Sequence, residues 1–540
     1  MSRPTLTSFD FKNLMGVRAA VTLIIVHYHF RPGGIRRVVE LATPHLRQAL
    51  PRLDTVLLVS GEARDAAWNR HFARRLAPVR LRLHTAPELG YFSELSVPAA
   101  RVRRRVRQQL TRLLAPYTPD NCVVWAHNLG IGRNAILAAE LARGCARRRL
   151  RLISHHHDWW FDNRWLRVPE LRRAGYPGLT AIARTLFPRG TEIRHATINQ
   201  EDATILAAGP LQPSAWLPNL AAPLPPPARP RATAARRWLH RRLDRDGAPV
   251  WLLPCRLLRR KNVAEALLLT RWLRPEAWLV TTGDVSSADE LPYFHKLADA
   301  ARRHRWRLRL GVLQGSEARK PTVPELLAAA EAVLLTSIQE GFGLPYLEAA
   351  AASRPLLARE LPNITPDLAR FGFRFPQAYT EIQIPLDLFD HRAERMRQEK
   401  LFARWRRALP AAVRALADTP ALLRATRPDQ TVPFSRLTLT AQLEVLSLPA
   451  ARSWECCQKL NPFLRAWRQR AQERQLRVTT WPARADRWLS GRSYARRFVR
   501  LLNSPSPPGT QPDARALQAA FIAKKLCAAN LYPLLWTKEP

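Results

Sequence analysis

The sequence lacks any long hydrophobic run. Its 540 residues contain no window that approaches the roughly 18 uninterrupted apolar residues of a membrane-spanning helix. The best early candidate, residues 19–26, is short and continues into His27-Tyr28-His29 rather than into a small-residue cleavage site. We therefore predict a buried strand here, and neither a membrane span nor a signal peptide.

Cysteine is also scarce. The six cysteines are scattered along the chain without a C-x-x-C pair or the spacing of a disulfide framework. This usage predicts reduced thiols and a cytoplasmic protein. The adjacent Cys456 and Cys457 could form a redox pair, but neighbouring helical cysteines are more often inert, and we predict that outcome.

Lysine and acidic residues are few beside arginine. The chain has 43 Asp and Glu against 86 Lys and Arg, of which only nine are lysine, and its formal net charge is +43. Such a surface attracts nucleic acid, anionic lipid and phosphate groups weakly and in a salt-dependent way. The arginines are dispersed and accompany no recognisable nucleic-acid reader motif. The alternative hypothesis is therefore a basic nucleic-acid-binding protein without catalytic activity. We predict no binding to a specific nucleic acid.

Two parts of the chain show the strand-then-helix rhythm of α/β folds. We predict an N-terminal Rossmann-like domain over residues 1–220 and a second one over residues 249–395. Between them, residues 221–248 are rich in proline and arginine and predict a stiff linker or a surface excursion. Residues 396–540 predict a helical C-terminal extension of unknown role. The predicted strands are residues 18–26, 55–60, 122–126, 150–154, 250–254, 277–281, 307–312 and 332–336.

The segment SIQEGFGLPYLEA, residues 337–349, follows a predicted buried strand and precedes a helix that starts near Pro345. Open α/β sheets bind ligands at such a strand end. Gly341 and Gly343 allow backbone to approach a ligand closely, and the helix offers free N–H groups to an anion. Glu340 and Glu348 can accept hydrogen bonds from paired sugar hydroxyls. Taken alone, Glu348 could equally complement the helix dipole.

Residues 324–355, which contain this segment, resemble the donor-site signature of group-one glycosyltransferases. These are retaining, metal-independent enzymes of the GT-B fold in glycosyltransferase family four. Their E-x7-E element matches Glu340 and Glu348. Three further matches follow the order of the family, over about residues 18–390 and most strongly over 250–360: the strand-end arginine and downstream lysine at Pro254 to Asn262, a "PN" element at Leu217-Pro218-Asn219, and an N-terminal glycine loop at Pro32-Gly33-Gly34-Ile35.

The resemblance implies a role for each matching donor-side residue. Arg256 and Lys261 would bind the two phosphates of a nucleotide sugar and counter the charge on the departing nucleotide. Glu340 would hold the transferred sugar, and Glu348 the ribose. Arg256 and Lys261 are otherwise two among many basic residues, and Cys255 departs from the glycine that the family often has. The remaining donor-binding residues are Gly341, Phe342, Gly343 and Leu344.

The resemblance also implies the fold and the reaction. We expect a GT-B protein, with two Rossmann-like domains facing across a cleft and an additional, mainly helical C-terminal region. The expected reaction transfers a sugar from a nucleotide-sugar donor to a glycan or a lipid-linked acceptor, with retention of configuration. Neither a cofactor nor a metal is expected.

A histidine cluster follows another predicted strand, in the segment SHHHDWWFD at residues 154–162. Related enzymes carry a loop histidine and a nearby acid that face the sugar, and we favour His156 and His157 with Asp158. A zinc site is the weaker alternative, because consecutive residues cannot all converge on one ion. The neighbouring Trp159 and Trp160 could form a sugar-stacking wall or simply pack.

Two further segments are candidates on the acceptor side. Gly33 and Gly34 form the glycine loop, and His127 and Asn128 follow a third strand, where they could contact the acceptor or form an ordinary capping turn. Residues 101–114 place arginines beside an apolar stripe, as interfacial helices do. A peripheral position at the inner face of an anionic membrane is therefore an additional hypothesis, and a solvated helix face is the alternative.

Overall fold

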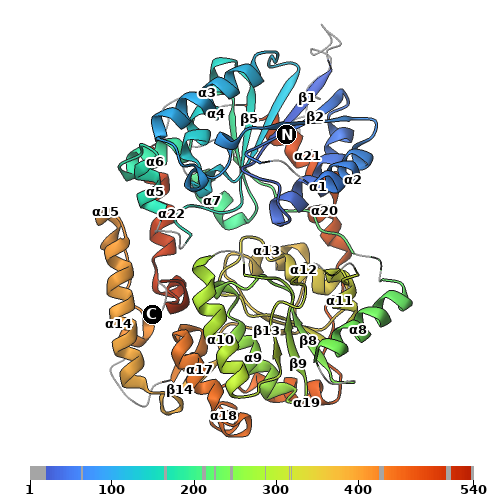
Figure 1. Ribbon diagram of the computed structural model, residues 1–540, viewed down its shortest axis with the longest axis vertical. Coiled ribbons are helices and arrows are strands. Elements are labelled where there is room, and N and C mark those ends of the chain that lie inside the picture. Colours follow the sequence, from blue (N-terminus) through green and yellow to red (C-terminus); the bar gives the residue numbers. More distant parts are fainter. Residues whose placement is uncertain are drawn as a thin grey trace, which may run out of the picture.

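The computed structural model describes residues 20–62, 65–162, 167–208, 214–223, 225, 227–243, 247–285, 288–315, 317, 319–424, 431–505 and 513–536. Over these residues the chain forms two α/β domains, blue to cyan and green to yellow in Figure 1. Orange and red segments from the C-terminal part of the chain lie against both domains (Figure 1).

The first domain is built on a seven-stranded parallel sheet of order β3-β2-β1-β4-β5-β6-β7. The central strands are almost wholly buried, as expected for a parallel sheet with helices on both faces. Its strands are β1 (Val21–Val26), β2 (Leu53–Ser60), β3 (Arg80–Thr85), β4 (Cys122–His127), β5 (Arg151–His156), β6 (Ile193–Thr197) and β7 (Ser214–Trp216). Its helices are α1 (Gly34–Ala49), α2 (Ala66–Leu76), α3 (Ala99–Leu114), α4 (Ala135–Arg147), α5 (Val168–Arg173), α6 (Leu179–Leu186) and α7 (Gln200–Ala208).

The second domain repeats this plan with a six-stranded parallel sheet of order β10-β9-β8-β11-β12-β13. Its strands are β8 (Val250–Leu253), β9 (Trp278–Thr281), β10 (Leu308–Arg309), β11 (Ala332–Leu335), β12 (Leu356–Arg359) and β13 (Gln377–Tyr379). The helices between them are α9 (Val263–Leu273), α10 (Leu291–Arg303), α11 (Val323–Ala329), α12 (Leu344–Ala351) and α13 (Thr365–Phe371).

The predicted GT-B architecture of two Rossmann-like domains is confirmed. In the first sheet β1 lies between β2 and β4, and in the second sheet β8 lies between β9 and β11, so the strand order reverses at β1 and at β8. Ligands of open α/β sheets bind outside the carboxyl ends of the strands at such reversals. The candidate residues after β4, β5, β8 and β11 all leave the sheets from these ends.

The proline-rich segment is only partly an extended linker. Helix α8 (Arg229–Leu243) begins after the proline cluster and buries Trp238, Leu239 and Leu243 in the core of the second domain. The prediction of a stiff linker or surface excursion over residues 221–248 is therefore wrong for α8. Alanine, leucine and arginine favour a helix once the prolines end.

The C-terminal residues pack against both domains. On the first domain, Phe498 of α21 (Gly491–Leu502) packs beside α1, and Phe521 of α22 (Ala514–Lys525) packs beside α6. The second domain receives α17 (Leu439–Ser447), α18 (Ala450–Cys457) and α19 (Phe463–Gln472) against α9. The other elements are β14 (Gln383–Pro385), β15 (Thr431–Pro433), α14 (His391–Ala408), α15 (Ala411–Arg414), α16 (Ala421–Arg424) and α20 (Asp486–Leu489).

The apolar stripe of α3 is not available to a membrane. Val102, Val106, Leu110 and Leu114 are at most 2% exposed and belong to the core of the first domain. Their burial favours the solvated-face interpretation of residues 101–114 and removes the basis for an interfacial helix. Among the described helices, none combines the length and the apolar character that a bilayer span requires.

Candidate active site

Two loops of the second domain are fastened to each other at the strand ends. One follows β8 and passes through a single 3-10 turn, Arg259–Lys261, to Asn262, whose φ of 47° marks a left-handed start of α9. The other follows β11. The Thr336 hydroxyl donates to the carbonyls of Lys261 and Asn262, and Ile338 N donates to Arg260 O at 2.9 Å. Residues 254–262 and 336–343 therefore form one surface.

Glu340 lies at the centre of this surface as a buried carboxylate with two cationic partners. Its Oε2 accepts from Arg260 Nη1 at 2.9 Å, and its Oε1 pairs with Lys261 Nζ. Burial raises the pKa of Glu340, but Lys261 and Arg260 outweigh it and lower the pKa to about 2. Asn363 also donates to the Glu340 carbonyl. The side chain is therefore ionised and fixed in place.

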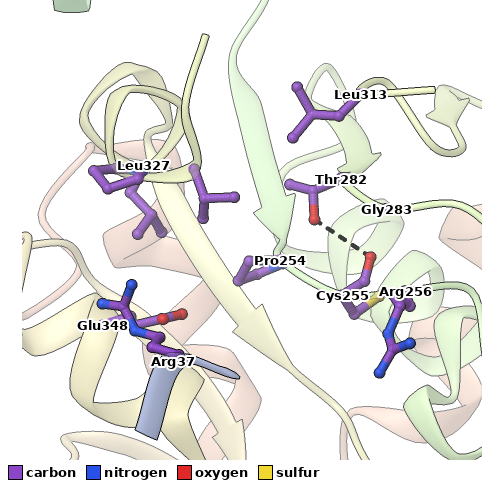
Figure 2. A pocket seen from close by; sticks show the side chains of 11 residues that line it. Arg37, Pro254, Cys255, Arg256, Thr282, Gly283, Leu313, Leu327 and Glu348 are labelled. Atoms are coloured by element: carbon purple, nitrogen blue, oxygen red, sulfur yellow. Dashed lines mark hydrogen bonds between the residues drawn. The ribbon is translucent and has the colours of Figure 1, made fainter. Parts of the chain in front are cut away.

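A cavity of about 360 Å³ is lined by residues of the second domain and by Arg37 of the first domain (Figure 2). Arg256 and Cys255 lie on one side, and Glu348 of α12 lies on the other, close to Arg37 of α1 in the first domain (Figure 2). The volume falls within the usual range of small-molecule sites. The other lining residues are Pro254, Thr282, Gly283, Leu313, Val323, Pro324 and Leu327.

The cavity combines one carboxylate, two guanidinium groups and an apolar wall. Burial raises the pKa of Glu348, and Arg37 and Lys261 oppose that rise. Arg256 has no acidic partner among the described residues, in contrast to Arg259, Arg260 and Lys261. Its guanidinium is therefore free to bind an anion that enters the cavity.

Cys255 shapes the loop after β8 through its backbone. Its carbonyl accepts from Gly283 N at 2.8 Å and from the Thr282 hydroxyl at 3.3 Å. Burial raises the pKa of its thiol to about 12, with smaller effects from Lys261 and Glu340. Lys261 and Glu340 thus act electrostatically on a residue that lines the cavity. The six cysteines all lie in described residues and are all free thiols.

Gly341 and Gly343, in the loop after β11, are each required for a different structural reason. Gly343 has a φ of 77° and sits against Tyr346, so that an added Cβ would be both strained and in collision. Gly341 lies against the first domain: an added Cβ would approach the His157 carbonyl oxygen to 3.1 Å. Phe342 and Leu344 send their side chains toward the core of the second domain, which leaves only their backbone for a ligand.

At Gly341, the histidine segment of the first domain (residues 154–162) thus meets the two loops after β8 and β11, which we call the donor loops. Asn128, left-handed at φ 61°, organises that segment, because its Oδ1 accepts from the backbone N of His157 and of Asp158. Burial lowers the pKa of Arg260, but Glu340 and then Asp158 raise it above its usual value. The His157 carbonyl and the Asp158 carboxylate therefore lie beside Gly341, and Asp158 acts electrostatically on the Arg260 partner of Glu340. Asn128 acts as a turn-organising residue, which favours the capping interpretation.

His156 does not share this position. Its Nε2 bonds His195 Nδ1 at 2.9 Å and its ring stacks on Trp159 inside the first domain, on the sheet face opposite to His157. The expectation that His156 faces the sugar is therefore not supported by its placement. Trp159 and Trp160 are at most 1% exposed and bond Asp202 and Gln518, so they pack rather than form a sugar-stacking wall.

The acceptor-side glycines leave open space at the start of α1. Gly34 begins the helix, and an added Cβ there would meet nothing within 4 Å. Arg37, one turn along, lines the cavity with Glu348. His127 is fully buried beside His155 and His157, which keeps its ring away from solvent.

Sequence reasoning missed Arg37 and Arg260. Arg260 is adjacent to Lys261 and pairs with the same carboxylate. The spacing of residues after the strand gave no reason to assign Arg260 a role beside that of Lys261. Arg37 lies on the other domain, and only the packing of the domains brings it to Glu348.

Similarity to known proteins agrees with this site. Residues 238–373 match the family model described as glycosyl transferases group 1. The matched residues belong to the second domain and include Arg256, Lys261, Glu340 and Glu348.

A curated relative is mannosylglucosyl-3-phosphoglycerate synthase of Petrotoga mobilis, 24% identical over 351 residues, or 63% of this chain. The match spans 65% of the length of that relative. Two solved structures are similar in fold. OtsA in its apo form shows 12% identity and a TM-score of 0.48, with 90% of this chain and 100% of that one covered. HepE of Anabaena in complex with UDP-glucose shows 15% identity and a TM-score of 0.45, with 84% and 98% covered.

Proposed function

We propose that the protein is a glycosyltransferase that moves a sugar from a nucleotide-sugar donor to a hydroxyl group of an acceptor. One observation carries this proposal. The inter-domain cavity presents Glu348 and Arg256, which has no acidic partner among the described residues, to the same space. The Lys261–Glu340 pair joins the loop that continues from Arg256 to the loop after β11. A nucleoside diphosphate bound to a sugar offers matching groups in this order: an apolar base, paired ribose hydroxyls, two phosphates and further hydroxyls.

The nucleoside would occupy the cavity itself. Leu313, Val323 and Leu327 supply an apolar wall for a flat base, and Glu348 accepts hydrogen bonds from the ribose hydroxyls. Arg256 would bind the diphosphate together with Lys261. In the ligand-free protein Lys261 is paired with Glu340, so donor binding would share this cation between the carboxylate and a phosphate.

The chemistry would be carried by fixed charges. When the bond between the sugar and the diphosphate breaks, negative charge grows on the leaving phosphate, and preorganised cations stabilise it. Arg256 and Lys261 fill this role without a metal ion. Glu340, held ionised by Arg260 and Lys261, would orient the sugar hydroxyls.

The first domain would supply the other side of the sugar. His157 and Asp158 approach Gly341 and would contact the transferred sugar and the incoming acceptor, which we expect to be a glycan or a lipid-linked glycan. Both reaction partners would then lie between the domains. We propose retention of configuration, as the E-x7-E resemblance implies.

The proposal is tested by incubating the full chain, both with and without EDTA, with UDP-, ADP-, GDP- and dTDP-sugars and measuring release of the nucleoside diphosphate. One donor should be hydrolysed slowly, and added acceptor should accelerate release. Absence of release from every donor, together with absence of any rise in thermal stability, would contradict the proposal, because a native-state ligand must stabilise the fold.

A further inference from the structure

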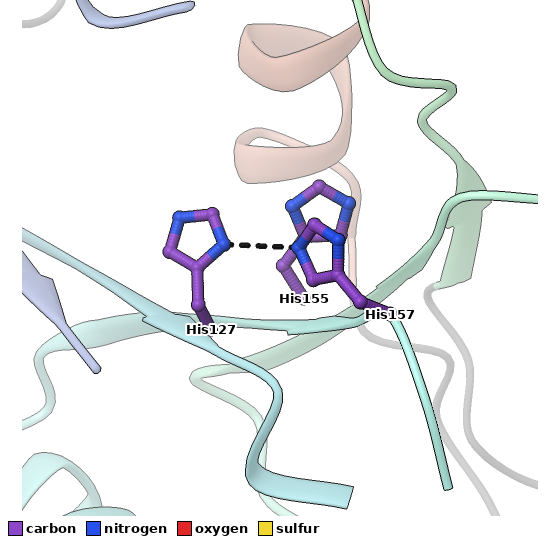
Figure 3. Close-up of side chains that lie close together, drawn as sticks. All are labelled: His127, His155 and His157. Carbon is purple, nitrogen blue, oxygen red and sulfur yellow. Dashed lines mark hydrogen bonds between the residues drawn. The ribbon is translucent and has the colours of Figure 1, made fainter. Parts of the chain in front are cut away.

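Three histidines of the first domain converge at the carboxyl ends of two neighbouring strands. His127 of β4 and His155 of β5 are paired in the register of the parallel sheet. His157 lies two residues beyond His155 and therefore on the same face, since side chains alternate along an extended chain. One ring nitrogen from each residue lies within 4.8 Å of the other two. Figure 3 shows the three rings gathered on one side of the strands.

The cluster is buried and its hydrogen bonds are incomplete. His127 and His155 are 0% exposed, and His157 is 9% exposed. One bond joins His127 Nδ1 to His157 Nε2 at 3.0 Å. Within the described residues, both ring nitrogens of His155 and Nε2 of His127 lack a hydrogen-bond partner of good geometry, although the Leu217 backbone opposes the lowering of the His155 pKa. Buried polar atoms are nearly always satisfied, so the His155 nitrogens beside the His127 Nδ1–His157 Nε2 pair favour a further ligand here.

The opposite face of the same strands provides an internal comparison. His156 and His195 also meet there, and His195 uses both ring nitrogens, one toward His156 Nε2 and one toward the Pro188 carbonyl at 3.0 Å. That pair is anchored to backbone within the protein. His156 Nδ1 also has no partner among the described residues, so the contrast is one of degree: the pair has two bonds for four ring nitrogens, and the His127–His155–His157 cluster has one internal bond for six.

We propose that His127, His155 and His157 form a three-histidine site for a divalent transition metal ion, with Zn²⁺ as the best match. Neutral imidazole nitrogen is a ligand that zinc prefers, and it does not suit the hard cations Ca²⁺ and Mg²⁺. The cluster contains neither thiolate nor carboxylate. Three protein ligands leave the fourth tetrahedral position for a water molecule or another exogenous ligand.

The charge and the position of the site indicate its role. Asp158, next in the chain after His157, provides a negative charge beside the cluster, and its electrostatic effect reaches both His27 and His157. A bound ion would replace the His127–His157 hydrogen bond and fix His157, whose carbonyl lies against Gly341. The metal would thereby position the segment that faces the donor loops. It is separate from the diphosphate, for which Arg256 and Lys261 are placed.

The test measures metal binding directly and does not depend on activity. Full-length protein without a polyhistidine tag is stripped with EDTA, dialysed and titrated with Co²⁺ and then with Zn²⁺. We expect one Co²⁺ per chain, with the visible absorption bands of a nitrogen-ligated ion that Zn²⁺ displaces. Saturating Zn²⁺ should also raise the melting temperature. His155→Gln should weaken Co²⁺ binding by at least about tenfold, as loss of one of three ligands requires.

His156→Gln is the matched control, since it removes a buried neighbouring histidine from the opposite face and should leave Co²⁺ binding unchanged. His127→Gln provides a second variant, and circular dichroism checks the folding of each. Absence of Co²⁺ bands in the wild-type protein would overturn the proposal. Equal Co²⁺ affinity in the wild type and in a folded His155→Gln or His127→Gln variant would overturn it as well.

Discussion

The two parallel sheets place different chemistry at their carboxyl ends. In the first sheet, neutral imidazoles from β4 and β5 meet in a buried cluster with unsatisfied nitrogens. In the second sheet, opposite charges meet: Glu340 pairs with Arg260 and Lys261, and Arg256 remains without an acidic partner among the described residues. Gly341 brings the two ends into contact through the His157 carbonyl.

This difference separates two ways of building a site. The charged loops of the second sheet are joined by short-range contacts, and the second domain presents the Arg256 guanidinium and the Glu348 carboxylate to an open cavity. The imidazole cluster is enclosed by protein and depends on strand register. We infer that the second sheet recognises the donor, and that the first sheet positions what faces it.

The largest effect is expected at Glu340. Glu340→Gln keeps the shape of the side chain but removes the negative charge between Arg260 and Lys261. Without that charge, the two cations are no longer held in position and can attract the donor phosphates away from their productive position. We expect kcat/KM for donor turnover to fall on the order of 10²-fold or more, as for loss of a preorganised charge contact. Nucleoside diphosphate release measures the change.

Glu140→Gln is its matched control. Glu140 is also a buried carboxylate with several arginine partners, Arg103, Arg107 and Arg143, but it lies on α4 of the first domain and not on the loops after β8 and β11. Breaking either ion-pair cluster should cost stability. Only the Glu340 change should abolish turnover; equal activity losses in two folded variants would show that the charged loops have no special role.

A smaller and more specific effect is expected at Glu348. Glu348→Gln should raise KM for the donor about 10- to 100-fold with little change in kcat, because it weakens charge-assisted hydrogen bonds to the ribose that persist throughout the reaction. Steady-state kinetics with the active donor checks this.

Glu325→Gln is the control for Glu348, since Glu325 caps the adjacent helix α11 through Thr322 and bonds no cavity residue. That change should leave KM unaltered. A dominant loss of kcat in Glu348→Gln would place the residue at the reacting sugar instead of at the ribose.

The smallest effect concerns a contact between the domains. Asp367 of α13 accepts from the backbone N of Gln200, at the start of α7 in the first domain, at 2.9 Å. Burial raises the pKa of Asp367 to about 6, while the Gln200 N–H and Arg370 oppose that rise. The folded protein therefore binds a proton here more tightly than the unfolded chain, so stability falls as pH rises from about 4 to 6.

Asp367→Asn removes this titration and keeps an amide oxygen for Gln200. We expect the variant to be more stable than the wild type by about 1 kcal/mol above pH 6, with the difference shrinking to near zero at pH 4. Thermal unfolding across this pH range measures it. A stability difference that does not change with pH would mean that the Asp367 carboxylate titrates normally.

Much of the second sheet could be predicted from sequence because its site lies in contiguous segments. Glu340 and Glu348 belong to one loop and helix, and Arg256 and Lys261 belong to another loop, so the family resemblance could match both pairs within short segments. Hydrophobic runs also located eight of the strands in the two sheets, but β3, β6, β7, β12 and β13 were missed. Strand β3 is largely exposed, β6 contains Arg194 and His195, and β7, β12 and β13 are only three or four residues long.

The first sheet was harder to predict because its cluster forms across strands. The alternation of His155 and His157 was visible in the sequence, but the adjacency of three histidines led to the expectation that they diverge. The partner His127 depends on the parallel register of β4 with β5, which no local pattern specifies. The path of α21 and α22 over the first domain is likewise a matter of tertiary packing.

The most direct test of the account is calorimetric titration of the wild-type protein and of Arg256→Ala with nucleoside diphosphates and their sugars, in EDTA. Arg259→Ala serves as the control, because Arg259 lies on the same loop as Arg256 but is paired with Glu290. We predict one site per chain for one nucleotide, with affinity at least about tenfold weaker in Arg256→Ala and unchanged in Arg259→Ala. Equal affinity of all three proteins, or no binding of any nucleotide sugar, would contradict a donor site between the two domains.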